Sequence, residues 1–463
     1  MNSDKELAML RERIAEKTLN IIRMVGERNE LARKIGHIKA RNSLPIHDEE
    51  TEMALFDMVA EECARAEVSA EAGFKILNSL LAESKRVQGV SSEQQLETPM
   101  QSFRKAEEMQ TRGVDLIRLD VGEPDFKPPE KVVQACIDAL KNFKTHYTVT
   151  RGIPELLESL TLYLKRKWNS DISTDQTIVT SGGRFAVYAG LASVLKEGES
   201  AIVIDPSWPA YKQAITYIGA RPLVINTRFE DGWNPSLEAI KKMIRNNTRA
   251  IVLNYPNNPT GKVLDTSTFN SIIDIANDRN LVVMSDETYI DYSFNKCSSV
   301  LESNAKNYIC IGSFSKTWAM TGFRVGYAIS SIDVINKMAM IASLMLTSVP
   351  EFVQYAAIAA LDCDEEALVN SATIKERADT ICQHIEKIAN MEVYRPDGAM
   401  YVFPRFRSVV GARGFSDKLL KEKHVSITSG TAFGNYPDHF RISLGRSKEL
   451  LIEGLKRIGD VLN

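Results

Sequence analysis

The chain has 463 residues and a formal net charge of −3, which gives no overall attraction to nucleic acid or to an anionic membrane. Its 44% hydrophobic and 25% charged residues are typical of soluble globular proteins, and its length allows two or three domains. The sequence has neither an apolar run long enough to cross a bilayer nor an apolar signal segment, so we expect a cytoplasmic protein. The scattered cysteines include no C-x-x-C pair, which predicts reduced thiols and neither a disulfide frame nor a metal site.

The first segment predicts three helices. Apolar residues recur at helical spacing from Leu7 to Ile38, which indicates one long helix from residue 5 to about 42. Two shorter helical stretches follow at about 47–66 and 69–88. Because one helix is far longer than the others, the three cannot bury their apolar faces within a single chain, and pairing with a second copy is expected.

Charged and polar side chains occupy particular positions on these helices. Arg28 and Lys39 are eleven residues apart, close to three full turns, and therefore share one face of the long helix. Arg11, seventeen residues before Arg28, points about 100° away and is better placed to serve the pocket of a partner. Two pairs have i, i+4 spacing and project together: Asp48 with Glu52, and Ser84 with Gln88. A charge-rich, solvated helix face is the alternative interpretation of this pattern.

The phrases LRERI, ERNELARKIGHIK, LPIHDEETE and AESKRVQ resemble the all-helical chorismate mutases, of the intertwined-dimer type, over residues 5 to about 88. The resemblance implies rearrangement of chorismate to prephenate, with cations on both carboxylates and donors at the ether oxygen, where negative charge develops. The implied roles are carboxylate binding by Arg28, Ser84 and Arg11 of the partner subunit, donation to the ether oxygen by Lys39 and Gln88, and contacts at the hydroxyl end by Glu52 and Asp48. Thr51 stands where this family frequently has an arginine. A module kept only for dimerisation or regulation is the alternative.

The polar stretch 89–98 (GVSSEQQLET) has no periodicity and predicts a linker, after which the pattern changes. Short apolar runs alternate with helical stretches: TIVTSGG, AIVIDPS, AIVLNYP, LVVMSDE, YICIGSFSK and RVGYAIS. This alternation predicts an α/β fold with a mostly parallel sheet wrapped by helices. Each run ends in polar or small residues, at the strand ends where such sheets bind their ligands.

The first of these strand ends carry side chains suited to a phosphate and a flat ring. In TSGGRFAV, Gly182 and Gly183 expose backbone N–H groups at a helix N-terminus, which favours a phosphate, and Arg184 adds positive charge. Trp208 in DPSWPAY offers a flat face on which a ring can stack. A simple turn and a core tryptophan are the ordinary alternatives.

The next strand ends suit the polar atoms of a pyridine ring. Asp286 in SDETY follows a buried strand, where a carboxylate needs a partner such as a protonated pyridine nitrogen. Tyr289 in the same motif, and Asn258 in NYPNNPTG, can bond a phenolic oxygen of the ring. By itself, NPTG is also a common tight turn.

The last motifs supply an amine and two arginines. A lysine that forms an imine must lose its proton, and partial burial near positive charge lowers its pKa. Lys316 in SFSKTWAMTGFR has Arg324 eight residues later, and the hydroxyls of Ser313 and Ser315 can complete the contacts to a phosphate. Arg441 in FRISLG is a candidate for binding a substrate α-carboxylate, with a salt bridge at the rim as the alternative.

Together these motifs resemble the class I/II, fold type I aminotransferases over residues 99–463, and SKTWAMTGFRVGY is closest to the prokaryotic aspartate/aromatic branch. The resemblance implies pyridoxal phosphate as the cofactor. It also implies a large cofactor domain at about 145–345 and a small domain made of about 99–144 and 346–463. The helical domain then covers residues 1–88.

The resemblance further implies a role for each residue. Lys316 is the Schiff-base lysine and carries a proton between two carbon centres, while Arg441 binds the substrate carboxylate beside Gly122 of LDVGEPDF. Tyr147 in HYTVTRG resembles a tyrosine that reaches the phosphate of the neighbouring subunit, which implies an obligate dimer. The ring atoms are held by Asp286 at the nitrogen and by Tyr289 and Asn258 at the oxygen. The remaining cofactor-binding set is Gly182, Gly183, Arg184, Trp208, Ser313, Ser315 and Arg324.

The leading interpretation is a bifunctional enzyme of aromatic amino-acid synthesis. Its substrates are chorismate, an amino-acid donor, and prephenate or an aromatic 2-oxo acid as acceptor. An aspartate aminotransferase with a regulatory or dimerising helical domain is one alternative, and a pyridoxal-phosphate-dependent lyase is another. A regulator that only binds the cofactor is disfavoured because we find no DNA-binding helices and no basic patch in the sequence.

Overall fold

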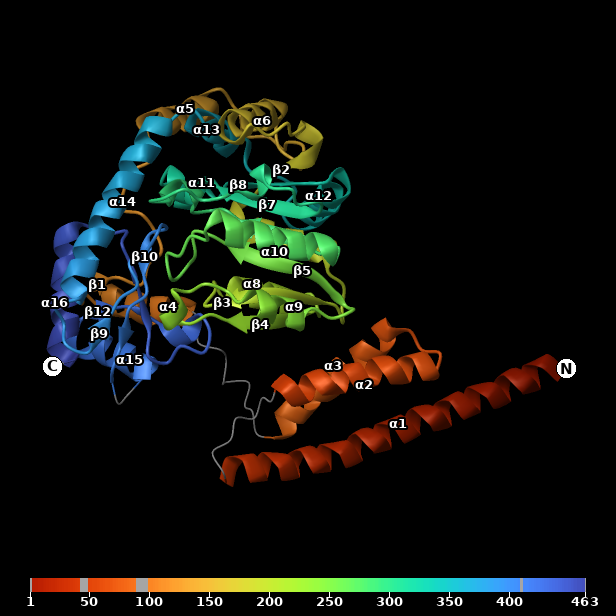
Figure 1. Ribbon diagram of the computed structural model, residues 1–463. Coiled ribbons are helices and arrows are strands. Elements are labelled where there is room, and N and C mark those ends of the chain that lie inside the picture. Colours follow the sequence, from red (N-terminus) through yellow and green to blue (C-terminus); the bar gives the residue numbers. More distant parts are fainter. Residues whose placement is uncertain (1, 42–48, 89–98, 409–410, 463) are drawn as a thin grey trace. The chain divides into compact units, whose positions relative to one another are not determined.

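The computed structural model describes residues 2–41, 49–88, 99–408 and 411–462. The chain divides into two compact units, residues 1–96 and 97–463 (Figure 1). In the part of the chain that the structure describes, we find no helix long and apolar enough to cross a membrane.

The first unit consists of three helices, as predicted: α1 (Asn2–Arg41), α2 (Glu49–Arg65) and α3 (Ala70–Val87). Helix α3 packs against both of the others. Two glycines allow these close approaches. A Cβ on Gly73 would lie 2.0 Å from Sγ of Cys63 in α2, and a Cβ on Gly36 would lie 3.0 Å from Cα of Gln88. A side chain at either glycine would collide with the neighbouring element, so both positions need glycine.

Helix α1 is far too long for its partners to cover. In the single chain its large apolar side chains are mostly exposed: Leu7, Leu10, Ile14, Leu19, Ile21, Ile22, Leu31, Ile35 and Ile38. An exposed apolar face of this length is unusual for a soluble monomer.

The second unit is built on a seven-stranded sheet with the strand order β2-β8-β7-β6-β5-β3-β4 (Figure 1). Strand β8 runs antiparallel to both of its neighbours, and the remaining pairs are parallel. The strands are β2 (Thr177–Thr180), β3 (Ser200–Asp205), β4 (Arg221–Asn226), β5 (Thr248–Asn254), β6 (Val282–Asp286), β7 (Tyr308–Ser313) and β8 (Gly326–Ser330). The predicted mostly parallel sheet is confirmed.

Helices cover both faces of this sheet, because its strands are apolar on both sides. One face packs against α7 (Gly182–Val194), α8 (Ala210–Tyr217) and α12 (Ile332–Met345). The other packs against α6 (Pro154–Trp168), α9 (Leu237–Met243), α10 (Thr266–Asp278) and α13 (Glu351–Ala360), with α5 (Glu130–Lys141) lying against α13.

A smaller region with its own apolar core joins the two ends of this unit. From the early part come α4 (Pro99–Thr111) and β1 (Ile117–Arg118), which pairs with β12 (Val425–Ser426). The late part supplies α14 (Asp364–Ile385), α15 (Gly411–Lys423), α16 (Lys448–Leu462), β9 (Met391–Glu392), β10 (Tyr401–Val402), β11 (Arg405–Phe406), β13 (Thr428–Ser429) and β14 (Phe440–Ser443). Residues after β1 and Arg441 of β14 line one cavity together with residues at the carboxyl ends of the central strands.

Candidate active site

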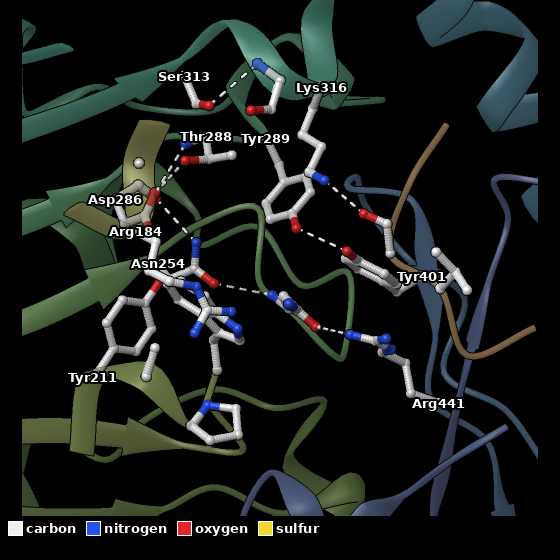
Figure 2. Close-up of a pocket in the computed structure, with 18 of the residues that line it drawn as sticks. Arg184, Tyr211, Asn254, Asp286, Thr288, Tyr289, Ser313, Lys316, Tyr401 and Arg441 are labelled. Atoms are coloured by element: carbon white, nitrogen blue, oxygen red, sulfur yellow. Dashed lines mark hydrogen bonds between the residues drawn. The ribbon is translucent and has the colours of Figure 1, made fainter. Parts of the chain in front are cut away.

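A cavity of about 510 Å³ opens at the carboxyl ends of the parallel strands (Figure 2). Most of the side chains proposed from the sequence line it together: Gly122, Gly183, Arg184, Trp208, Asn258, Asp286, Tyr289, Ser313, Ser315, Lys316, Arg324 and Arg441. Gly182 adjoins it through Arg324. Tyr147 does not line the cavity of its own chain, and it is 89% exposed.

Lys316 follows β7 in the one-turn helix α11 (Phe314–Thr317), which begins at Ser313. The Ser313 hydroxyl accepts a hydrogen bond from the backbone N–H of Ser315 at 3.2 Å, so the strand ends in a fixed turn. The Lys316 amine points into the cavity and donates to the carbonyl of Gly122 at 2.6 Å (Figure 2).

The environment of Lys316 favours an uncharged amine. Burial is the main cause and lowers the pKa of Lys316 to about 8. The carboxylate of Glu123 opposes this shift, while the cations of Arg441 and Arg324 add to it. The shift moves Lys316 towards the uncharged form, which a nucleophilic or proton-transferring lysine requires.

Asp286 ends β6 and is 4% exposed. One carboxylate oxygen accepts from the Tyr211 hydroxyl at 2.6 Å, and the other accepts from the Thr288 hydroxyl at 2.6 Å and the Thr288 N–H at 3.1 Å (Figure 2). Burial raises the pKa of Asp286, although these hydrogen bonds oppose the shift. Among the described residues we find no cation in an ion pair with Asp286. A cationic ring nitrogen is the kind of partner that this buried carboxylate lacks.

Tyr289 and Asn258 also line the cavity. The hydroxyls of Tyr289 and Tyr401 are 2.8 Å apart, and the Asn258 side-chain oxygen accepts from Arg441 at 3.0 Å. Asn254 fixes this arrangement, because its side chain accepts from the N–H of Asn258 at 3.0 Å and donates to the carbonyl of Asp286 at 3.0 Å. Asn258 and Tyr289 both line the cavity, and Asn254 and Arg441 fix the orientation of Asn258.

Arg441 reaches the cavity from β14 with only 4% exposure. Its guanidinium donates to the carbonyl of Asp120 at 2.6 Å and lies 4.5 Å from the ring centre of Tyr401. Its Nε is buried and makes no hydrogen bond in the described structure. A buried guanidinium with an unused donor is suited to an incoming carboxylate.

The end of the cavity nearest α7 is strongly cationic. A Cβ on Gly182 would lie 2.6 Å from a guanidinium nitrogen of Arg324, so only glycine allows this approach. The Arg184 guanidinium lies 4.6 Å from the Trp208 ring centre, and burial together with Arg324 lowers the pKa of Arg184. Two arginines beside a helix N-terminus fit a phosphate.

Several residues of the cavity were not found from the sequence. Thr288 and Asn254 stand inside motifs that we singled out, so their position in the chain was a usable signal. Tyr211 lies three residues after Trp208 and contacts Asp286 only because α8 folds over the sheet. Phe103 and Tyr401 come from the smaller region, and we find no sequence motif that predicts their place in the cavity.

The helical unit brings together some of the residues that the sequence predicts to bind chorismate. Arg28 in α1 donates to the Leu80 carbonyl at 2.8 Å and also to the hydroxyl of Ser84, which is buried. Gln88 follows α3, and its side-chain oxygen is buried without a hydrogen-bond partner in the described structure. The half-buried Lys39 lies further along α1.

Three residues of this set are not joined to it. Arg11 is exposed and lies about 26 Å along α1 from Arg28 at the usual helical rise, so it cannot reach the same pocket in one chain. Asp48 lies outside the described residues. Glu52 falls within α2, but its side chain lies outside the described structure.

Comparison with known proteins agrees with both units. Residues 114–458 match the family described as aminotransferase class I and II, and residues 10–89 match chorismate mutase type II. The chain therefore belongs to the aminotransferase class I and II family, with a chorismate mutase type II domain before it. The predicted fusion of these two kinds of enzyme domain is confirmed.

The individual relatives match the second unit. An aspartate aminotransferase of Pyrococcus horikoshii is 36% identical over 78% of this chain and 93% of its own length. A protein of Aquifex aeolicus named probable aspartate/prephenate aminotransferase is 32% identical over 77% of this chain and 94% of its own. The crystal structure of an aspartate aminotransferase from Thermotoga maritima matches with a TM-score of 0.76 and 34% identity, over 80% of this chain and 98% of that one. The predicted fold class is thereby confirmed, and aminotransferases of this family use pyridoxal phosphate.

The environment of Lys316 generates a testable prediction. In the cofactor-free protein, acylation of the Lys316 amine should reach half its maximal rate near pH 8, because only the neutral amine reacts. The rate is measured by mass spectrometry of the Lys316 peptide as a function of pH, and a short lysine peptide, with its pKa of about 10.4, is the control. A midpoint for Lys316 equal to that of the peptide would contradict this prediction.

Proposed function

We propose that the chain is a bifunctional enzyme. Its helical domain converts chorismate to prephenate, and its second domain transfers an amino group from aspartate or glutamate to prephenate or to an aromatic 2-oxo acid derived from it. The observation that carries this proposal is the union, in one chain, of a chorismate mutase domain with an aminotransferase domain. A relative of the second domain bears a name that includes prephenate, which supports the same substrate.

Pyridoxal phosphate, when bound, supplies an aldehyde that condenses with amines and a ring that accepts electrons. Lys316 is the residue that we propose to bind the aldehyde, and its amine moves the proton at the α-carbon of the substrate. Asp286 would accept a hydrogen bond from the ring nitrogen, and the raised pKa of this carboxyl reflects burial that such a cation would offset. Tyr289 and Asn258 would hold the ring oxygen.

The charged groups of the cavity are placed to hold the phosphate of the cofactor and the α-carboxylate of the substrate. Arg324, Arg184 and the N-terminus of α7 hold the phosphate, together with Ser313 and Ser315. Arg441 binds the α-carboxylate, with Gly122 beside it, and its unused Nε supplies one of the donors. Because the phosphate and the carboxylate are held at opposite ends, the reacting carbon is kept near Lys316.

For the mutase reaction we propose a site completed by a second chain. Arg28, Ser84, Lys39 and Gln88 come from one subunit and Arg11 from its partner. The exposed apolar face of α1 supports this pairing, because a second copy would cover it. The 89% exposure of Tyr147, away from its own cavity, supports a dimer of the aminotransferase domain as well.

A second candidate is an aspartate aminotransferase whose helical domain only dimerises or regulates. The names of the relatives from Pyrococcus horikoshii and Thermotoga maritima favour it. The two candidates differ in whether the helical domain turns over chorismate and in which oxo acid the second domain prefers.

The acceptor preference tests the first proposal. With glutamate as donor and pyridoxal phosphate added, we expect kcat/KM for prephenate or an aromatic 2-oxo acid to exceed that for oxaloacetate by about tenfold or more, which corresponds to about 1.4 kcal/mol of transition-state binding. The panel is prephenate, phenylpyruvate, hydroxyphenylpyruvate and oxaloacetate. Preference for oxaloacetate would instead support the aspartate aminotransferase.

A single substitution tests the mutase. Lys39→Ala should reduce chorismate turnover by about a hundredfold or more, because it removes a donor to the developing negative charge, and should leave transamination unchanged. The assay follows the loss of chorismate and, separately, the amino-group transfer. The exposed Lys34 of the same helix provides the matched control, Lys34→Ala. Equal chorismate turnover in all three proteins would show that Lys39 has no part in catalysis.

A further inference from the structure

A polar cluster lies next to the helix that carries Lys316 but outside the lining of the cavity. Its members are Tyr163 and Lys167 of α6, Asp291 of the short helix η3 (Ile290–Tyr292), and Thr317 of α11. We call these four side chains the Lys167 cluster. The roles proposed above do not use any of them.

Asp291 is the centre of the Lys167 cluster. One of its carboxylate oxygens accepts from the Lys167 ammonium, which also donates to the Tyr163 hydroxyl at 2.9 Å. Its other oxygen accepts from the hydroxyl of Thr317 at 2.9 Å. Asp291 thus joins α6 to the residue that directly follows Lys316.

The neighbouring residue of η3 makes a second contact to the same helix. The hydroxyl of Tyr292 donates to the backbone carbonyl of Lys316 at 2.7 Å. Asp291 and Tyr292 follow Tyr289 of the cavity by two and three residues. One short segment therefore holds both the Tyr289 side chain and the helix of Lys316.

The surroundings of Lys167 stabilise its positive charge. The side chains of Lys167 and Asp291 are only 23% and 22% exposed. Burial works against the charge on Lys167, but Asp291 and Tyr163 outweigh it and raise the pKa of Lys167 above its usual value. Burial and Asp291 raise the pKa of Tyr163 to about 12. Lys167 therefore keeps its charge at neutral pH, which suits a fixed structural role and not proton transfer.

Helix α11 depends on such outside contacts. It has only four residues, and a single helical turn is not stable by itself. The adjoining Trp318 packs 5.1 Å from the ring of Phe314, which fixes the apolar side of the turn. The polar side is fixed by Asp291 and Tyr292 through the contacts described above.

We infer that Asp291, held by Lys167, is a positioning residue that sets the place of the Lys316 amine through Thr317. The inference rests on the proposed proton transfer by Lys316. A lysine that moves a proton between two atoms must keep its amine within reach of both, and small displacements of such a group slow the reaction strongly. Removing the Asp291 charge weakens the hold on α11, and with it the placement of the Lys316 amine, while the cavity side chains on the other elements keep their contacts.

Hydrogen–deuterium exchange on the cofactor-free full chain tests the structural half of this inference. In Asp291→Asn, amides of residues 313–320 should exchange about tenfold faster or more, as expected for loss of a charge-assisted hydrogen bond, while those of β5 stay unchanged. Asp171→Asn is the matched control, because it breaks the exposed pair of Asp171 with Lys165, also of α6. Unchanged exchange over 313–320 in Asp291→Asn would overturn the inference.

Kinetics of the pyridoxal-phosphate-loaded enzyme test the functional half. With glutamate as donor, Asp291→Asn should lower the rate of the single-turnover half-reaction by about tenfold to a hundredfold and change the Kd of glutamate by less than about twofold. The isotope effect from deuterium at the α-carbon should rise, because proton transfer becomes more rate-limiting. A lower affinity for glutamate with an unchanged rate would overturn the inference.

Thr317 provides a test that keeps the ion pair intact. Thr317→Val removes the hydroxyl at constant shape and should reproduce both effects of Asp291→Asn, whereas Thr317→Ser keeps the hydroxyl and should restore the parent behaviour. If Thr317→Val behaves like the parent chain, the inference is wrong even where Asp291→Asn fails to fold. If the parent chain transaminates none of the oxo acids, the proposed function fails, while the exchange data still decide whether Asp291 holds α11.

Discussion

The second unit depends on burying an amine and a carboxyl group in the same cavity, where burial disfavours the charged form of each. Lys316 has its pKa lowered mainly by burial, and Asp286 has its pKa raised by burial. Asp286 ends β6, and Lys316 lies in α11 directly after β7, which pairs in parallel with β6, so the sheet brings the two segments together. In the protein alone, burial disfavours the charged form of both groups. A cationic ring that bears an aldehyde would satisfy both at once.

The cavity is formed jointly by the central sheet and the smaller region. The sheet supplies the amine, the carboxylate and the cationic end at α7. The smaller region supplies the Gly122 carbonyl that accepts from Lys316, the Tyr401 hydroxyl that contacts Tyr289, and Arg441. The cavity is therefore lined by β10, β14 and the segment after β1 on one side, and by the strand ends of the large sheet on the other. In the helical unit, by contrast, the exposed apolar face of α1 and the exposed Arg11 suit a site that is shared between two chains.

Much of the cavity could be predicted because its residues stand at strand ends, where a local motif and the parallel topology together fix their place. Asp286, Asn258 and Lys316 are examples. Tyr211 could not be predicted in this way, since its contact with Asp286 depends on how α8 folds over the sheet. Tyr401 and Phe103 reach the cavity only through the packing of the smaller region. Tyr401 lies in a two-residue strand, which is too short to give a periodic pattern in the sequence. Helical periodicity related Arg28 only to Lys39, and Ser84 only to Gln88, so the grouping of Arg28 with Ser84 came from the resemblance to the chorismate mutases. The place of Arg11 depends on a second chain that one sequence does not position.

The most direct test of this account is to identify the residue that holds the cofactor. The full chain is loaded with pyridoxal phosphate, reduced with borohydride, digested, and analysed by tandem mass spectrometry. The account predicts a single phosphopyridoxyl group on the peptide that contains Lys316, and no labelled peptide in Lys316→Ala. Label on another lysine, or an equal yield of label in the variant, would contradict it.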